Sequence, residues 1–385
     1  MLNNTLISLQ IKNFRSLRDV KLTTDSLTVL FGPNGAGKST FLEALWLARE
    51  CAVVGVDIAL SRRYDGVGAR WDGAKEGEPI SIGIETQQFG YEIQFDYQDN
   101  RITPRVREKL LETQRLLIDR EIGPHQETTT TNFAVVTVPN QLSQTQYTNI
   151  HPSVVEIEPF LRRVRYYQAR SANFSQLRQP RLQSTVGTQL NETCDNLWFV
   201  LHHLYQKRAV DNRYNTIMEL MQESFPRYRG LVFEQTASNS IYAHFLEKGR
   251  REPTPAFAIA DSYLQMLVHL TALFSENKER ALILLDEPEG SLHPWALSVL
   301  ADALETATQN WNKQVLMATQ SPVLISQFDP QYIVTTEMDE IGQTVMTRAS
   351  ESQAILDWLD DYEMGLLYMS EMVAPQSQRL EIQAI

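Results

Sequence analysis

The chain is poor in cysteine, in long apolar runs and in basic charge. Its 385 residues include only two cysteines, Cys51 and Cys194, which lie far apart and in no metal-ligand spacing. This pattern predicts inert thiols and excludes a disulfide framework or a zinc site. The longest apolar stretches are about half the length of a membrane span, and the N-terminus lacks the apolar core of a signal peptide. We therefore expect a cytoplasmic protein with no membrane partner.

The charge balance is acidic, with 47 Asp and Glu against 35 Lys and Arg and a net charge of −12. This balance argues against a protein that coats nucleic acid with its whole surface, but it is compatible with a local basic patch. No internal repeat and no sustained heptad pattern is present, which excludes a solenoid and a coiled-coil arm. Hydrophobic residues make up 43% of the chain, enough for a large folded domain.

The apolar pattern predicts an α/β protein. Residues 6–12 and 27–31 read as strands, and the second runs into a glycine-rich turn and then a helix over 40–51. Residues 79–98 alternate apolar and polar side chains, which favours antiparallel hairpins in a side sheet. Three further short apolar strands with helices between them imply a parallel sheet, and they span residues 281–285, 314–318 and 332–336.

The middle of the chain has a different pattern. The spacing of apolar residues over 105–120 predicts a helix, because Val106, Leu110 and Leu117 fall at helical intervals. The polar stretch 123–152 predicts a mobile loop or insertion. From Asn191 onward helical patterns dominate, so we expect a helical subdomain before the second set of strands.

A phosphate-binding loop is the strongest motif. GPNGAGKST at 32–40 has the G-x-x-x-x-G-K-[ST] spacing between a strand and a helix, where successive backbone N–H groups and the helix N-terminus cradle phosphates. Lys38 is expected at the β- and γ-phosphates, the Ser39 hydroxyl at Mg²⁺ and Thr40 at the α-phosphate side. The residues expected to bind the nucleotide are Gly32, Asn34, Gly35, Ala36, Gly37, Lys38, Ser39 and Thr40.

An acidic pair, Asp286 and Glu287, follows the apolar strand at 281–285. The carboxyl ends of parallel strands are where an open α/β sheet binds ligands. Asp286 is expected to hold Mg²⁺ directly or through water, and Glu287 to polarise the water that attacks the γ-phosphate. Together with the phosphate loop, this pair predicts a site for ATP and Mg²⁺.

The segment LLDEPEGSLHP at 284–294 resembles the extended Walker B motif and D-loop of ABC-type ATPases in the SMC and RecF-like group. The whole chain resembles the bacterial AAA-family ATPases with an ABC-type head. The resemblance implies an α/β P-loop NTPase head with a mixed or parallel sheet, an antiparallel side sheet and a helical subdomain. It also implies that Ser291 and His293 lie at an interface between two heads.

Two further positions follow from this resemblance. Gln320, after the strand at 314–318, stands where ABC transporters usually have a histidine that senses the γ-phosphate. Glutamine can orient water but cannot carry a proton charge, so hydrolysis is expected to be slow. IKNFRSLRDVKL at 11–22 resembles the first strands of RecF-like heads, which makes Arg15, and less strongly Arg18, a candidate nucleotide contact; a solvated surface arginine is the alternative.

The signature segment departs from the family pattern. It fits only residues 258–273, where Ala260, Asp261 and Ser262 stand in place of the Ser-Asp-Gly or Ser-Gly-Gly usual in related heads, so the expected serine and glycine are lost. In a head-to-tail dimer those residues would contact the partner's γ-phosphate, so the departure puts a transdimer sandwich in question, with Ser262 as a substitute from a shifted position. For the glutamine that joins the metal site, Gln168 is our choice, with Gln94 as an alternative.

Residues 159–191 contain no acidic residue, but they carry many arginines and aromatics. Such interleaving suits phosphate contacts and base stacking, and it equally suits ion pairs with this protein's own acidic surface. The residues are Arg162, Arg163, Arg165, Arg170, Arg178 and Arg181 with Phe160, Tyr166, Tyr167 and Phe174. A second, weaker basic patch comprises Arg101, Arg105, Arg107, Lys109 and Arg115.

The tail, WLDDYEMGLLYMSEMV at 358–373, resembles a segment that packs beside the head in the same group, with loose matches at Tyr362, Gly365 and Tyr368. We expect one head over 1–385. Its parts would be an N-terminal lobe (1–100), an insertion and helical region (101–275), a C-terminal lobe (276–350) and the tail (351–385).

Three functions remain open at this point. The first is an ATPase whose heads dimerise on ATP and act on DNA, in DNA maintenance or anti-phage defence. The second is a nucleotide-gated module that hydrolyses little and recruits a separately encoded protein effector. The third is a transporter ATPase, for which no coupling-specific feature is found. No carboxylate cluster outside the acidic pair suggests a nuclease.

Overall fold

The computed structural model describes most of the chain. The described residues are 5–63, 68–97, 104–112, 115–122, 157, 159–168, 172–179, 188–237, 240–275 and 281–375. The loop expected over 123–152 lies outside these residues. Within them, no helix is both long and apolar enough to cross a bilayer.

A six-stranded sheet forms the centre, in the order β15-β14-β3-β13-β12-β8. The five strands from β14 to β8 are parallel, and β15 pairs antiparallel at one edge. The strands are β3 (Leu27–Phe31), β8 (Val164–Gln168), β12 (Ala281–Asp286), β13 (Lys313–Thr319), β14 (Ile333–Met338) and β15 (Thr344–Arg348). The expected strands at 27–31, 281–285, 314–318 and 332–336 are therefore confirmed.

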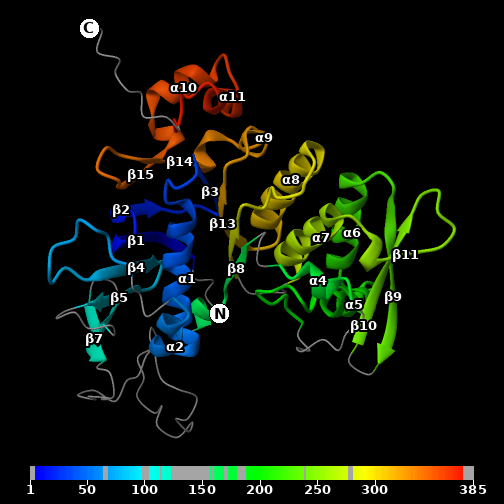
Figure 1. Ribbon diagram of the computed structural model, residues 1–385, viewed down its shortest axis with the longest axis horizontal. Coiled ribbons are helices and arrows are strands. Elements are labelled where there is room, and N and C mark those ends of the chain that lie inside the picture. Colours follow the sequence, from blue (N-terminus) through cyan, green and yellow to red (C-terminus); the bar gives the residue numbers. More distant parts are fainter. Residues whose placement is uncertain are drawn as a thin grey trace, which may run out of the picture.

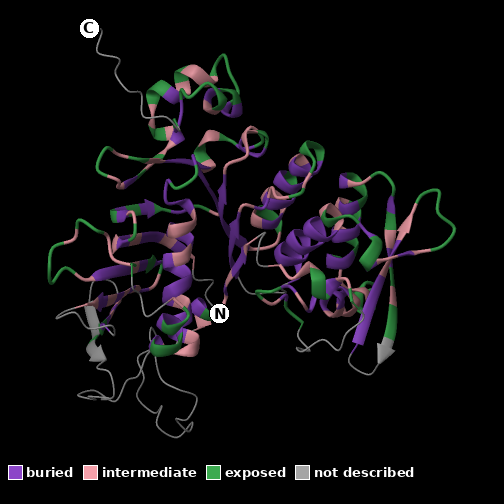
Figure 2. Cartoon of the chain, viewed as in Figure 1, coloured by how far each residue is buried: buried purple, intermediate pink, exposed green. Residues whose placement is uncertain are grey.

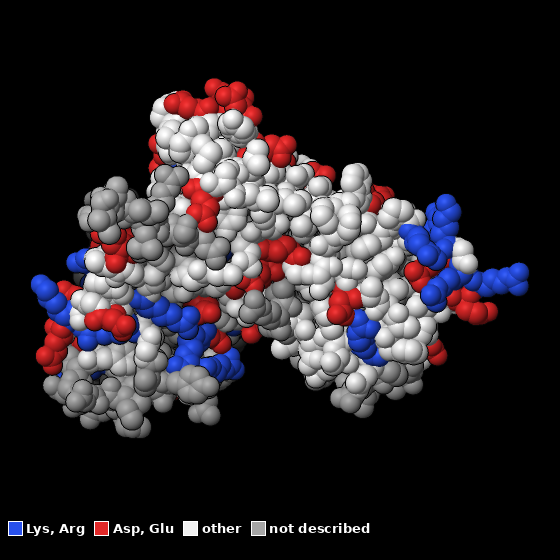
Figure 3. Space-filling model, turned by 45° about the horizontal axis from the view of Figure 1, so that its top comes forward, with Lys and Arg blue, Asp and Glu red and all other residues white. Residues whose placement is uncertain are grey.

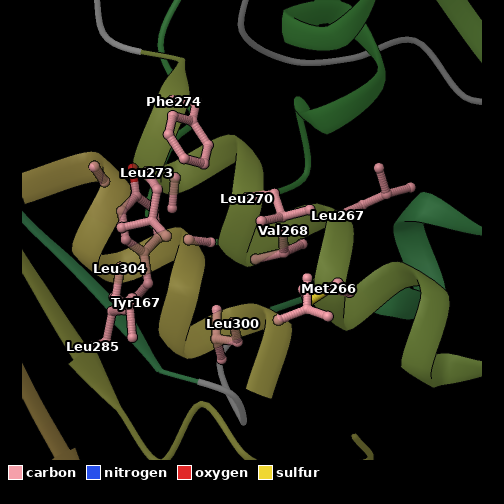
Figure 4. Close-up of a cluster of buried hydrophobic side chains, with 14 of the residues drawn as sticks. Tyr167, Met266, Leu267, Val268, Leu270, Leu273, Phe274, Leu285, Leu300 and Leu304 are labelled. Carbon is pink, nitrogen blue, oxygen red and sulfur yellow. The ribbon is translucent and has the colours of Figure 1, made fainter. Parts of the chain in front are cut away.

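Helices cover both faces of this sheet (Figure 1). Alternate residues of each strand join different cores: Leu284 packs with α1 (Lys38–Val54), whereas Leu285 packs with α7 (Asp261–Phe274) and α8 (Pro294–Asn310). Figure 4 shows the second core, in which Leu270 and Leu273 from α7 lie near Leu300 and Leu304 from α8. Central strands are buried throughout (Figure 2), as expected of a sheet covered on both sides.

The N-terminal lobe adds an antiparallel sheet in the order β2-β1-β4-β5-β6-β7. Its strands are β1 (Leu6–Phe14), β2 (Leu17–Thr23), β4 (Ile80–Thr86), β5 (Gly90–Asp96), β6 (Arg105–Glu112) and β7 (Arg115–Ile122). The short helix α2 (Val56–Ser61) follows α1. The hairpin expected over 79–98 is confirmed as β4 and β5, which pair antiparallel.

The helix expected over 105–120 is wrong, because β6 and β7 form a hairpin there. The interval from Val106 to Leu110 fits a strand as well as a helix, and both side chains are buried on one face of β6. Between them on the same face, Glu108 is buried and accepts a hydrogen bond from the Tyr91 hydroxyl at 2.7 Å. Pairing with β5 thus selects the strand over the helix for residues whose apolar spacing fits both.

The second lobe combines helices with a small sheet that the sequence pattern did not reveal. Its helices are α4 (Phe174–Leu177), α5 (Leu197–Lys207), α6 (Arg213–Ser224) and α7. Against them packs a three-stranded antiparallel sheet, β11-β10-β9, formed by β9 (Tyr228–Ala237), β10 (Ser240–Glu247) and β11 (Thr254–Pro255). The helical subdomain is confirmed, but it is a mixed one.

The tail packs on the head as expected. It comprises α10 (Gln353–Leu359) and α11 (Met364–Met369), and α11 contacts the short helix α9 (Pro322–Ile325). The Tyr368 ring meets Phe31 of β3 edge to face, with centroids 4.4 Å apart. Gly365 lies so close to α9 that a Cβ there would be 2.3 Å from the Pro322 carbonyl oxygen.

Candidate functional site

The phosphate loop joins the carboxyl end of β3 to the N-terminus of α1, where the sequence predicts it. Gly37 caps α1 at φ 100°, in the left-handed region that favours glycine, and a Cβ would lie 2.2 Å from the Thr344 hydroxyl oxygen. A Cβ at Gly32 would lie 2.0 Å from the Thr336 carbonyl oxygen. The loop is therefore closely supported by β14 and β15.

Lys38 is 5% exposed and donates hydrogen bonds from Nζ to the carbonyl oxygens of Gly32 and Pro33, each at 2.7 Å. The ammonium group thus lies within the loop that the motif predicts for the phosphates. Burial lowers the pKa of Lys38, while the nearby charges of Glu287, Asp286 and Glu289 act in the opposite direction.

Asp286 joins the phosphate loop to β8. Its Oδ1 accepts from the Ser39 hydroxyl at 2.8 Å, and its Oδ2 accepts from the Tyr166 hydroxyl at 2.9 Å and from Gln168 Nε2 at 3.3 Å. Gln168 stands opposite Asp286 in the register of β8 with β12. Burial, and then the Asp286 charge, raises the pKa of Tyr166, so the tyrosine stays protonated and donates. The sequence reasoning placed Gln168 here but missed the role of Tyr166.

The turn after Asp286 is conformationally strained, because Glu287 has φ 51°. Two residues later, Glu289 accepts a hydrogen bond from the backbone N–H of Gln320 at 2.9 Å. Burial raises the pKa of the Glu289 carboxyl. The ends of β12 and β13 are thereby tied together, and Glu287 and Gln320 lie at the same edge of the sheet as Lys38.

The donor set at this edge fits Mg²⁺ and a nucleotide phosphate. A hydroxyl and a carboxylate already in contact, Ser39 and Asp286, are oxygen ligands of the kind Mg²⁺ takes together with water and phosphate. The buried ammonium of Lys38 and the glycine-lined loop supply the complementary charge and N–H groups. Among the described residues, no group of three or more His, Cys, Asp or Glu could hold a metal ion, so the fit depends on phosphate and water.

Arg15 lies at the side of this site. Its guanidinium pairs with Glu43 of α1 and lies 5.4 Å from the Phe14 ring centroid. The side chain is 43% exposed. Its neighbour Ser16 approaches the loop, since a Cβ on Gly37 would lie 3.0 Å from the Ser16 hydroxyl. Nucleotide contact by Arg15 stays a prediction.

The residues expected at a head interface are exposed. Asp261 begins α7, where Ala260 provides no side-chain cap, and its carboxylate pairs with Arg178. Ser291 has φ 62°, and His293 caps α8 by accepting from the Trp295 N–H at 3.2 Å. Ser262 lies in the first turn of α7 and is partly buried. These four residues are accessible at the surface, and their part in an interface stays a prediction.

The basic segment is arranged differently from the stacking interpretation. Phe160, Tyr166 and Tyr167 are 4%, 8% and 2% exposed, so they fill cores and cannot stack on bases. Arg162 is exposed, and Arg163 and Arg165 are partly exposed. Arg170 and Arg181 lie outside the described residues. The described arginines therefore stay accessible to a ligand, whereas most of the aromatic side chains are buried in the protein core.

The second basic patch is partly neutralised within its own sheet. Arg107 binds both carboxylate oxygens of Asp119 at 2.6 Å, and Lys109 pairs with Glu92 at 3.3 Å. Arg101 and the side chain of Arg115 lie outside the described residues. Among the described part of this patch, two of the cations thus serve cross-strand ion pairs.

Two family models match the chain. One, described as "AAA domain, putative AbiEii toxin, Type IV TA system", matches residues 165–326, and the other, described as "AAA domain", matches residues 8–180. The first covers β8 with Gln168 and the acidic pair, and the second covers the phosphate loop.

Two curated proteins are similar over short stretches. The OLD nuclease of Thermus scotoductus is 57% identical over 37 residues, which is 10% of this chain and 7% of that protein. The DNA replication and repair protein RecF of Caulobacter vibrioides is 40% identical over 100 residues, 23% of this chain and 26% of that protein. The chain thus matches only about a quarter or less of each relative's length.

Solved structures of SMC heads share the fold. The SMC head bound to the C-winged helix domain of ScpA is 12% identical with a TM-score of 0.51, covering 89% of this chain and 96% of that one. The Pyrococcus furiosus SMC head with an extended coiled coil, bound to the C-terminal domain of ScpA, is 11% identical with a TM-score of 0.50, covering 93% and 100%. The phosphate loop, the acidic pair, the two matched AAA-domain models and the SMC-head fold together support an AAA-type ATPase with an ABC-type, SMC/RecF-like head.

Proposed function

We propose that the chain binds ATP with Mg²⁺ and hydrolyses it slowly. The observation that carries this proposal is the contact of the Ser39 hydroxyl with Asp286 beside the buried Lys38 ammonium. Lys38 holds the β- and γ-phosphates, Ser39 and Asp286 hold the metal ion, and Gln168 reaches the same carboxylate of Asp286. The metal ion, when bound, neutralises phosphate charge.

Glu287 orients and deprotonates the attacking water in this proposal. Its strained backbone, at φ 51°, is the kind of outlier that occurs where a catalytic side chain must be aimed. Gln320 orients water or phosphate through its amide but carries no proton, which favours a slow rate. The Tyr166 hydroxyl donates a hydrogen bond to Asp286 Oδ2 at 2.9 Å and so fixes the orientation of this carboxylate.

ATP binding would draw two heads together in the cytoplasm, and hydrolysis would separate them. The exposed residues Asp261, Ser291 and His293 and the partly exposed Ser262 support this step, since a partner can reach them. The names of RecF, a replication and repair protein, and of OLD nuclease favour work on DNA, in maintenance or anti-phage defence.

A second candidate is a nucleotide-gated module that dimerises, recruits a separately encoded protein effector and hydrolyses little. The signature segment favours it, because Ala260 lacks the hydroxyl that an incoming γ-phosphate would meet there. The carboxylate of the neighbouring Asp261 is paired with Arg178. The SMC head that was solved with the C-winged helix domain of ScpA gives a precedent for a partner protein on such a head.

One experiment separates the two candidates. Steady-state ATP hydrolysis is measured with and without double-stranded DNA, beside a Glu287→Gln control, while the mass of the protein in solution is followed with ATP. Turnover that DNA raises and the control abolishes supports the DNA-coupled ATPase. ATP-dependent dimer mass with negligible turnover supports the recruitment module, and a protein that binds no ATP overturns both.

A further inference from the structure

A hollow of about 450 Å³ lies beside the edge strand β8 and is lined by four arginines. Arg162 and Arg163 lie directly before β8, Arg165 lies on the strand itself, and Arg49 comes from α1. Guanidinium groups from two distant segments thus converge on one recess. On a chain of net charge −12, this concentration of positive charge requires an explanation.

The guanidinium groups are held in place by the fold. Arg165 donates to Gln189 Oε1 at 2.8 Å, and Arg163 donates to the Pro159 carbonyl at 3.0 Å. Arg49 is only 12% exposed; its guanidinium lies 4.3 Å from the Trp46 ring centroid, and its buried Nε has no hydrogen-bond partner. Only Glu192, at 3.3 Å from Arg49, supplies a carboxylate among the ion pairs described for that residue. Burying a cation so incompletely paired is costly unless an anion binds nearby.

We propose that this arginine-lined hollow binds the phosphodiester backbone of a nucleic acid. Planar guanidinium forks match phosphate oxygens better than the point charge of lysine does, and all four cations here are arginines. The buried aromatics described above leave no stacking platform among Phe160, Tyr166 and Tyr167, so contact is through phosphates and independent of sequence. This inference rests on the proposed function and deepens it by naming the surface that meets DNA.

The hollow is connected to the ATPase site by short contacts. The Arg49 guanidinium lies over the Trp46 ring, whose centroid is 5.8 Å from that of the Tyr166 ring, and the Tyr166 hydroxyl donates to Asp286. Arg165 is the neighbour of Tyr166 on β8 and stands opposite Ile283 of β12. A strand fixed by phosphate at Arg165 would therefore fix the residue that orients the metal-binding carboxylate.

A second basic surface provides a matched control. Lys and Arg side chains gather at the outer end of the three-stranded sheet (Figure 3), far from β8 along the chain's long axis. They are all exposed, and they project from strand ends: Arg227, Arg229, Lys248, Arg250 and Arg251. In the described part of the chain, none of these five residues lines either of the two hollows. Arg250 is also paired with Glu247 at 3.3 Å. We therefore assign nucleic-acid binding to the arginine-lined hollow and not to these five residues, the tip of the three-stranded sheet.

The test compares Arg162→Ala/Arg165→Ala with Arg227→Ala/Arg229→Ala in the full chain, which lose the same charge. Binding of a fluorescent duplex and a fluorescent single strand is measured by anisotropy over a range of salt. We expect the hollow variant to bind about tenfold or more weakly, with a salt slope smaller by about two, and the tip variant to stay within about twofold. Melting temperature and Mg-ATP binding are recorded on each variant to establish folding.

Several outcomes overturn the inference. Equal losses in both variants, or a loss in the tip variant alone, place the contact elsewhere. Poly-glutamate that competes as well as DNA shows a site for acidic protein segments. If the wild-type protein binds Mg-ATP but no nucleic acid at low salt, nucleic-acid binding in the hollow is refuted and the ATPase proposal is left intact. If it binds nucleic acid but no Mg-ATP, the ATPase proposal is refuted instead.

Discussion

The two regions around the proposed ATP site differ in how completely the chain supplies their contacts. At the phosphate loop, buried and partly buried groups meet each other, as Ser39, Asp286 and Tyr166 do through hydrogen bonds of 2.8 and 2.9 Å. At the N-terminus of α7 and after Glu287, the expected interface residues Asp261, Ser291 and His293 are exposed. On the proposed function, the first region is the finished half of a nucleotide site, and the second is an unfinished half that a second head would complete.

The energetics of the two regions should differ accordingly. A hydrogen bond to a buried charged group is worth about 1.5–3 kcal/mol, and leaving its partner unsatisfied costs more. An exposed ion pair such as that of Asp261 with Arg178 is worth about 0–1 kcal/mol. Substitutions in the finished half should therefore impair chemistry or folding, whereas those in the unfinished half should alter association with little effect on the fold.

The largest effect is expected from Glu287→Gln. The substitution removes the proposed general base while keeping the shape of the side chain, so turnover should fall about 10²–10⁴-fold. ATP binding should persist, because Lys38, Ser39 and Asp286 are untouched. Single-turnover phosphate release and equilibrium binding of a fluorescent nucleotide measure the two properties. Unchanged release would assign the base to another residue, and Glu289, held by the Gln320 N–H, would be the next to replace.

The stability that His269 contributes where α7 meets the turn after Asp286 should be sensitive to acid. His269 of α7 is 1% exposed, and its Nε2 donates to the Pro288 carbonyl at 3.0 Å, directly after Glu287. Burial lowers the pKa of His269 from 6.5 to about 4. The folded pKa is below the unfolded one, so the histidine's contribution to stability is present above pH 6.5 and is lost as pH falls to about 4. This loss amounts to about 3 kcal/mol.

His269→Gln tests this acid sensitivity, because glutamine stays neutral. Urea unfolding is measured between pH 7.5 and 4, and the difference in unfolding free energy between wild type and variant should shrink by about 3 kcal/mol over that range. Other titrating groups are shared by both proteins and cancel in the difference. Parallel pH curves would show that His269 does not titrate on unfolding.

A smaller effect should separate two glycines of the phosphate loop. Both have positive φ, 100° at Gly37 and 80° at Gly35, so alanine strains both backbones alike. Only at Gly37 does a Cβ collide, 2.2 Å from the Thr344 hydroxyl oxygen, whereas Gly35 has nothing within 4 Å. We expect Gly37→Ala to lower the unfolding free energy by about 2 kcal/mol more than Gly35→Ala, measured by urea unfolding. Equal losses would mean that Thr344 turns away without cost.

The same contrast explains what the sequence could predict. The phosphate loop and the acidic pair depend on local order, strand then turn then helix, and on charge at strand ends, so their elements were predictable. The hairpin of β6 and β7 was not, because Val106 and Leu110 fit two periods and only pairing with β5 decides. The β9–β11 sheet was hidden for a related reason, since helical runs on both sides dominate the pattern.

Within the site, what escaped prediction are the residues that act across sheet strands. Tyr166 looked like part of a stacking surface because arginines flank it, but the parallel register of β8 with β12 turns it toward Asp286. Glu289 holds the Gln320 N–H across 31 residues of sequence, and Thr344 lies against Gly37 of the phosphate loop from the far end of the chain. No local pattern marks such a residue, because its partner is set by the pairing of strands that lie far apart in the sequence.

The smallest effect on folding is expected at Asp261, in the unfinished half. Asp261→Asn removes a carboxylate that pairs with the partly exposed Arg178 but keeps a side chain that can begin α7. Unfolding free energy should change by about 1 kcal/mol or less.

ATP-dependent self-association of Asp261→Asn should strengthen. A γ-phosphate brought to this helix N-terminus no longer meets a like charge, and Arg178 is released to meet it. Sedimentation with Mg-ATP, in the Glu287→Gln background to prevent hydrolysis, measures the dimer constant. Weaker association of Asp261→Asn would mean that the carboxylate itself contacts the second head, and that the unfinished half joins a protein surface and not the partner's nucleotide.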